Sequence, residues 1–217
     1  MKKVFLPAIG LLVFFLAAGC APTLYTVDLK YTGDAPPPAA VSRQQFIMTV
    51  TLFNDTRSGG QDLLIGRVTT AMGGLTNVIP KTMSPANAVS TIVKDVLVKA
   101  GYQVSVAMPS WSLQEDAIRK EWGRIIVGGD IDELEIVCRN DIPIKTYDAR
   151  VRLTMVLADV KTGKIFHRVS TTSKNSLEHV YFSEEMLGQQ ISSAITEAVE
   201  KALEGPVLKE KIEAVLK

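Results

Sequence analysis

The sequence has few of the residues that most often carry chemistry. Its 217 residues include two cysteines and two histidines, and aromatic residues make up 6% of the chain. Lysine and arginine number 24 and aspartate and glutamate 23, so the strongly basic balance typical of nucleic-acid-binding proteins is missing. His167 and His179 have no third metal ligand at a recognisable spacing. We therefore expect neither nucleic-acid binding nor a metal cofactor.

Motifs for nucleotide binding and hydrolysis are missing too. Ser58-Gly-Gly60 and Gly73-Gly74 lack the Gly-Lys-Ser/Thr of a phosphate-binding loop, and no serine stands in a Gly-x-Ser-x-Gly elbow. Cys138 ends an apolar run and has no evident histidine partner, so we expect a small buried core residue. Because these catalytic motifs are missing, we expect the protein not to be an enzyme. The alternative of a hydrolase requires a buried polar cluster containing His167 or Asp55.

The chain also lacks an apolar run of the length that a membrane-spanning helix needs. The run Val4–Ala18 is shorter than about 20 residues and is interrupted by Pro7 and Gly10. Two lysines precede the run and small residues end it directly before Cys20. This layout predicts a cleaved export signal over residues 1–19.

The segment Leu16-Ala-Ala-Gly-Cys20 resembles the lipobox of bacterial lipoproteins, although Ala17 stands where those proteins usually have leucine. The resemblance implies that the Cys20 thiol receives a diacylglyceryl group and that the new N-terminus is N-acylated, and we expect no other cofactor. Two or more acyl chains hold a protein stably on a membrane. Ala21 stands where inner-membrane lipoproteins of that sorting system have aspartate, which implies the outer membrane.

Composition divides the mature chain in two. Residues 20–44 are predicted to be the lipidated N-terminus and a tether, because the proline cluster in Gly33–Ala40 favours extended chain. Within this segment Leu24–Lys30 alternates like a strand. Residues 45–217 are predicted to form a single periplasmic domain, since a chain of this length buries roughly 70% of its unfolded surface in one core.

Apolar alternation and β-branched composition predict the strands. They are Phe46–Phe53, Leu63–Val68, Tyr102–Ala107, Arg124–Cys138, Ala149–Asp159 and Ile165–Ser173. The alternation slips between Ile131 and Leu134, which predicts a β-bulge there. Lys161–Lys164 is predicted to be a hairpin turn, with positive φ at Gly163.

Three amphipathic segments predict helices. The first begins after an N-cap at Ser84 and ends at Gly101, and the second begins near Ser183 and ends before Gly205-Pro206. The third, Val207–Lys217, is short. The expected fold is α+β, an antiparallel or mixed sheet of about five strands with two long helices packed on one face, plus the short C-terminal helix.

Turn residues and hydrophobic spacing resemble those of the YajG family of bacterial lipoproteins. The matching segments are Asp55-Thr-Arg57, Ile65-Gly66, Asn77-Val-Ile-Pro80, Ala100-Gly-Tyr-Gln-Val104, Gly129-Asp-Ile131 and Thr162-Gly-Lys164. The resemblance implies a periplasmic α+β domain tethered to the outer membrane. The molecular activity of that family is poorly defined, so the resemblance implies no substrate.

Asp55, Arg57 and Arg67 bracket the glycine-rich loop Asn54–Gly60 and are the candidate ligand or partner site. Asp55 and Arg57 are also suited to a local ion pair that pins the loop to its own strand, and we favour this structural interpretation. Four further acids stand close together in the sequence, Asp130, Asp132, Glu133 and Glu135. They lie along a strand, so we expect cross-strand pairs with Arg150, Arg152 or Arg168 in preference to a calcium site.

Trp111 and Trp122 flank a polar segment and are suited either to stacking on a ligand or to completing a core. We expect the protein to be an outer-membrane-anchored periplasmic lipoprotein that acts as a non-enzymatic binding or adaptor module for an envelope protein partner. The alternative is an auxiliary lipid or small-molecule carrier for an envelope transporter. That alternative requires a continuous apolar pocket between sheet and helices.

Overall fold

The computed structural model describes residues 24–33, 46–58 and 63–216. The predicted export signal, Cys20 and the proline cluster after Gly33 lie outside the described residues. In chain order the elements are β1 (Leu24–Val27), β2 (Ile47–Val50), β3 (Asn54–Asp55), β4 (Gly66–Thr70), β5 (Leu75–Pro80), α2 (Pro85–Lys99), β6 (Gln103–Val104), η2 (Glu115–Ala117), β7 (Ile125–Asn140), β8 (Lys145–Asp159), β9 (Lys164–His179), α3 (Glu184–Leu203) and α4 (Pro206–Leu216).

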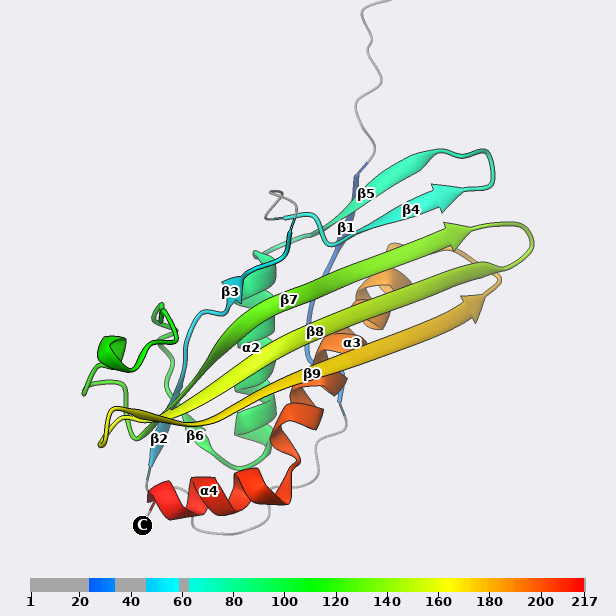
Figure 1. Ribbon diagram of the computed structural model, residues 1–217. Coiled ribbons are helices and arrows are strands. Elements are labelled where there is room, and N and C mark those ends of the chain that lie inside the picture. The colour runs from blue at the N-terminus through cyan, green and yellow to red at the C-terminus, as the bar shows by residue number, and fades with distance from the viewer. Residues whose placement is uncertain (1–23, 34–45, 59–62, 217) are drawn as a thin grey trace, which may run out of the picture.

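The described strands form one mixed sheet built around three long antiparallel strands (Figure 1). β8 pairs with β7 on one side and β9 on the other. Along its other edge, β7 pairs with β2, β3 and β4 one after another, and all three are parallel to it. β5 pairs antiparallel with β4, β1 pairs parallel with β5, and β6 pairs parallel with β2. The edge of β7 is therefore shared by three short strands.

The long strands follow the predicted patterns. Val151, Leu153 and Met155 of β8 are fully buried, while Arg150 and Arg152 are exposed on the opposite face. The pairing of β7 with β8 shifts between Ile131 and Glu133, which confirms the predicted bulge. Gly163 has a φ of 65° in the β8–β9 turn, as expected for a tight hairpin.

Both long helices cover the same face of the sheet (Figure 1). The side chain of Ser84 accepts a hydrogen bond from the Asn87 N–H (3.3 Å), and Ser183 accepts one from the Met186 N–H (3.1 Å). These contacts confirm the predicted N-cap at Ser84 and the predicted start of the second helix near Ser183. Apolar residues of both helices, such as Ile92 and Ile191, are fully buried against the strands.

A smaller core lies on the other face of β7 and β8. Trp111 and Trp122 are 2% and 9% exposed and pack with Ile126 and Val156. The Trp111 Nε1–H donates to the Gln114 carbonyl (2.9 Å). The two tryptophans therefore complete a core and are not available as a stacking platform.

The described sheet has nine strands, whereas the sequence predicted about five. β3 and β5 were missed, and β6 is only two residues long within the predicted Tyr102–Ala107. The predicted Leu63–Val68 strand is shifted to Gly66–Thr70. Short parallel strands and strands ended by proline give little alternation, so periodicity does not reveal them.

The sheet begins at Leu24, ahead of the domain boundary predicted at residue 45. Val27 and Leu29 are buried in the main core, and the Lys81 N–H donates to the Val27 carbonyl (2.9 Å). This part of the N-terminal segment is folded into the domain. Within the described part of the chain, no helix is both long enough and apolar enough to cross a bilayer.

Candidate functional site

The candidate site lies where the partner of β7 changes from β3 to β4. Asp55 of β3 pairs with Ile131, and Gly66 of β4 pairs with Ile136. Between these two pairs, none of the described strands lies beside β7 on this edge. The β7 bulge falls in the same interval, so the backbone here needs other hydrogen-bond partners.

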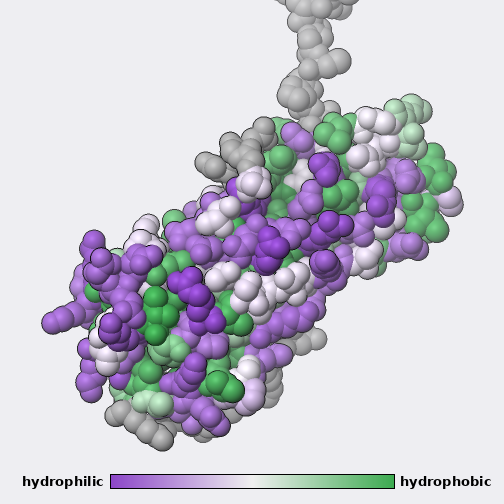
Figure 2. All heavy atoms as spheres, in the orientation of Figure 1, coloured by the Kyte–Doolittle hydropathy of each residue, from purple (hydrophilic) through white to green (hydrophobic). Residues whose placement is uncertain are grey.

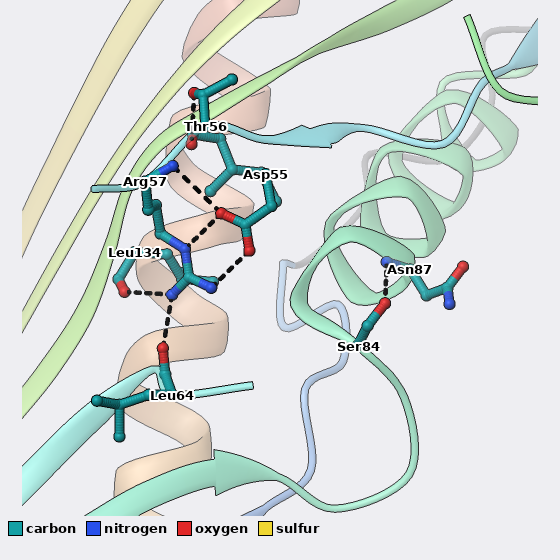
Figure 3. Close-up of polar contacts among 8 residues, drawn as sticks. Asp55, Thr56, Arg57, Leu64, Ser84, Asn87 and Leu134 are labelled. Carbon is teal, nitrogen blue, oxygen red and sulfur yellow. Dashed lines mark hydrogen bonds and ion pairs between the residues drawn. The ribbon is translucent and has the colours of Figure 1, made fainter. Parts of the chain in front are cut away.

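Arg57 supplies those partners (Figure 3). Its Nη1 donates to the Leu64 carbonyl (2.8 Å) and to the Leu134 carbonyl (3.2 Å). Its Nε and Nη2 donate to the two carboxylate oxygens of Asp55 at 2.7 and 2.6 Å. The guanidinium thus links β7 to the segment before β4 across the gap between strands, and Asp55 fixes its orientation.

The Asp55–Arg57 contact confirms the interpretation of a local ion pair that pins the loop. The two side chains are only 20% and 14% exposed, so the pair is shielded from solvent. The planar, bidentate geometry is the strong form of an arginine–carboxylate contact. Both Asp55 oxygens are committed to Arg57, which leaves this carboxylate poorly placed to act as a general base.

Arg67 lies nearby but makes a different and more exposed contact. Its Nη2 is 3.4 Å from a Glu135 carboxylate oxygen, and the Arg67 side chain is 53% exposed. Arg67 and the Asp55–Arg57 pair line one open groove of about 550 Å³. Arg67 and Glu135 alternate with residues buried in the main core, Val68 and Ile136, so the groove opens on the sheet face away from the helices. The charged residues of the groove are Asp55, Arg57, Arg67, Asp132, Glu133 and Glu135.

Of the four acidic residues of β7, one has a predicted β8 arginine as its partner, and the other three have different partners. The Asn54 side-chain amide donates to Asp130 (3.0 Å). Glu133 forms an ion pair with Arg152 of β8 (3.9 Å), as predicted for cross-strand pairing. Glu135 pairs with Arg67 of β4, which lies on the other side of β7 from the predicted β8 arginines. The Thr154 hydroxyl donates to Asp132 (2.7 Å). The described residues contain no cluster of three or more side chains arranged to hold a metal ion.

The residues that a hydrolase would have needed lie apart. His167 of β9 pairs with Leu157 of β8, whereas Asp55 lies beside Ile131 on the far edge of β7. Partial burial, and then the nearby charge of Lys211, lowers the pKa of His167. His179 accepts a hydrogen bond from the Tyr181 N–H (3.1 Å) at the end of β9. The structure does not join either histidine to Asp55.

Cys138 is fully buried, as predicted for a core residue. Burial raises the pKa of its thiol to about 11. The thiolate, which is the reactive form, is therefore scarce at neutral pH. This thiol is unsuited to nucleophilic chemistry.

α3 carries a polar stripe that the sequence pattern did not predict. Glu184 accepts from the Thr26 N–H (3.0 Å), Ser192 from the Lys30 N–H (3.1 Å), and Glu200 from the Tyr31 hydroxyl (2.9 Å). Residues four apart share one helix face, and the same spacing places Gly188 against this segment. A Cβ on Gly188 would lie 3.0 Å from the Asp28 carbonyl oxygen. The stripe holds the segment that follows β1 along the helix.

Comparison with solved structures identifies a shared fold. Protein XCC0632 from Xanthomonas campestris, assigned to the DUF330 family, superposes with a TM-score of 0.55 over 90% of this chain and all of that chain, at 12% identity. The two proteins have the same fold. The lipoprotein GNA1162 from Neisseria meningitidis matches 70% of this chain and 96% of its own at 11% identity, with a TM-score of 0.39. The LpoB C-terminal domain from Salmonella enterica matches 62% and 86% at 11% identity, with a TM-score of 0.30.

The last two scores are too low to establish a common fold. No protein-family model matches the chain. No curated protein matches it in sequence. The structural neighbours are thus bacterial proteins that include a named lipoprotein, and the resemblance to the YajG family stays a prediction.

Proposed function

We propose that this chain is a YajG-like lipoprotein anchored in the outer membrane through acyl chains on Cys20, with its domain in the periplasm. The export layout and the lipobox resemblance support the anchor. β1 begins four residues after Cys20, so the folded domain is attached close to the lipid. The fold shared with a bacterial protein is compatible with this assignment.

The domain acts as a non-enzymatic binding or adaptor module, and the groove at the β3–β4 junction is its binding surface. The supporting observation is that the two ion pairs of the groove differ in their exposure to solvent. Asp55 and Arg57 satisfy each other and the backbone, while Arg67 and Glu135 form a longer pair that is open to solvent. Exposed ion pairs of this kind are weak, so a partner can replace them at little cost. The groove favours a polar protein partner of the envelope.

The alternative, a lipid or small-molecule carrier, has less support. It requires apolar space between the sheet and the helices, and buried side chains of α2, α3 and the strands occupy that layer in the described structure. The groove lies on the opposite face and is lined by charged side chains. The observed geometry therefore does not support a carrier role.

Photo-crosslinking in intact cells tests the adaptor role. A benzophenone amino acid at Asn77 on the groove wall should yield a discrete protein adduct, whereas the same probe at Lys161 in the β8–β9 turn should not. The Arg67→Glu change in the Asn77 probe strain should abolish the adduct if the groove charges recognise the partner. Identical patterns from both probe positions would contradict the proposal.

The anchor is tested separately. Mass spectrometry of the mature N-terminal peptide should show acylated Cys20, and Cys20→Ala should move the protein out of the membrane fraction. An unmodified residue 20 in mature protein would remove the lipoprotein assignment and leave the groove experiment unaffected.

A further inference from the structure

One end of the sheet carries a cluster of exposed apolar side chains. The strand register places Thr70, Asn140, Lys145 and His179 in one row across β4, β7, β8 and β9. The two hairpin turns and the chain after β9 project beyond this row. Six exposed apolar residues on or beside these turns form the apolar end: Met72, Leu75, Ile142, Ile144, Val180 and Tyr181.

The apolar end brings together exposed apolar residues from separate parts of the chain. Its six side chains are between 45% and 99% exposed. Leu75 begins β5, and the other five lie on the turns and the chain segment that join or follow five neighbouring strands. Five strands at a spacing of about 4.8 Å span roughly 19 Å. In Figure 2, hydrophobic residues are gathered at the right-hand end of the molecule, where these turns lie. Exposed patches of this kind mark interaction surfaces.

The start of the described chain lies at the same end. Leu24 pairs with Asn77, two residues from Leu75, and β1 runs away from the apolar end in parallel with β5. Leu24 is four positions after Cys20 in the sequence, and an extended chain over four positions reaches at most about 14 Å. Acyl chains on Cys20 therefore enter a bilayer that lies beside the apolar end.

We propose that the apolar end inserts into the surface of that bilayer, so that the long strands stand away from the membrane. This inference rests on the proposed lipid anchor. Tyr181 suits the interface, because tyrosine buries its ring and keeps its hydroxyl in the headgroup layer. The charged residues nearest the turns, Arg139, Asp141, Lys145 and Glu178, balance in sign. The insertion is therefore driven by apolar burial and not by net charge.

Depth-dependent fluorescence quenching tests the insertion. The full lipoprotein carrying Ile142→Cys is labelled with nitrobenzoxadiazole and reconstituted in vesicles of phosphatidylethanolamine and phosphatidylglycerol. Spin-labelled lipids should quench the label at position 142, and its emission should shift to the blue. The matched label at Lys161→Cys, in the turn at the other end of β8, should show neither effect. Cys138 is buried and does not compete for the label.

Glutamate substitutions provide a second measurement, on the Cys20→Ala chain. Ile142→Glu should weaken vesicle partitioning roughly tenfold, because it replaces an inserted apolar side chain by a charge. Val106→Glu is the control, since Val106 is equally apolar, is 87% exposed and lies outside the apolar end.

The possible outcomes separate this inference from the anchor. Acylated Cys20 with no lipid quenching at position 142 would overturn the insertion and leave the anchor in place. A blue shift that appears without lipid, or that grows with protein concentration, would assign the apolar end to a protein partner or a second copy and would also overturn it. Quenching at position 142 with an unmodified Cys20 would support insertion and reject the anchor.

Discussion

At the scale of single residues, Arg57 has the most consequential contacts. The guanidinium donates to the Leu134 carbonyl of β7 and to the Leu64 carbonyl before β4, at the gap between β3 and β4. Asp55 orients it. Removing a shielded charge leaves its hydrogen-bond partners without donors, which usually costs more than the pair contributes. Arg57 is thus a structural residue at the edge of the proposed binding groove.

We predict that Arg57→Met lowers the free energy of unfolding by about 2 kcal/mol, because Asp55 and two carbonyls lose charged donors while the apolar stem is kept. Urea unfolding followed by circular dichroism measures the change. Arg67→Met is the matched control, since its pair with Glu135 is exposed, and it should change stability by less than about 0.5 kcal/mol. Equal losses in the two variants would contradict the role given to Arg57.

Cys138 supports a second prediction at this scale. In a Cys20→Ser background, iodoacetamide at pH 8 should leave the native protein unlabelled, because the thiol is buried and its pKa is raised to about 11. The same reagent should label one site in urea. Rapid labelling of the native protein, measured by mass spectrometry, would show that the β7 core opens readily.

At the scale of elements, α3 has two functional faces. One packs apolar residues such as Leu187 and Ile195 against the sheet, and the other binds residues that follow β1 through Ser192 and Glu200. The second face joins the N-terminal segment to the core. A force applied at the N-terminus, as from a lipid anchor, would therefore reach α3 directly.

We predict that Ser192→Ala loosens this segment without unfolding the domain. The Lys30 N–H loses its acceptor, which costs about 1 kcal/mol locally and should speed its amide exchange roughly fivefold. Hydrogen-exchange mass spectrometry of residues 24–33 measures the effect. Ser193→Ala, one position further along α3, is the control and should leave exchange in these residues unchanged.

At the scale of the whole molecule, β7 and β8 connect two cores. The main core lies under the helices, and the core of Trp111 and Trp122 lies on the opposite face. Val156 belongs to the second core while its neighbours Met155 and Leu157 belong to the first. Neither core can lose these strands without exposing the other.

We therefore predict one cooperative unfolding transition. Tryptophan fluorescence reports only the smaller core, because both tryptophans lie in it, and far-ultraviolet circular dichroism reports all helices and strands. The two midpoints in urea should coincide, as two-state unfolding requires. A fluorescence transition at lower urea would show that the tryptophan core opens independently.

The sequence by itself determined the elements whose signals are local. Ser84, Gly101 and Ser183 mark the helix ends through contacts within one turn, and the alternation along β8 follows from burial of one strand face. The bulge in β7 was visible as a slip in that same alternation. These features depend on residues a few positions apart, so a linear pattern contains them.

Only the tertiary structure decided what depends on residues far apart in the chain. β3 is too short to show a pattern, and pairing with the edge of β7 decides that β4 begins at Gly66 and not at the predicted Leu63. Arg57 matters because these two strands leave a gap between them. The apolar end likewise exists only because the register aligns segments that are far apart in the sequence, those around Met72, Ile142 and Val180. Hydrogen bonding between distant strands fixes these positions, and no local sequence pattern contains that pairing.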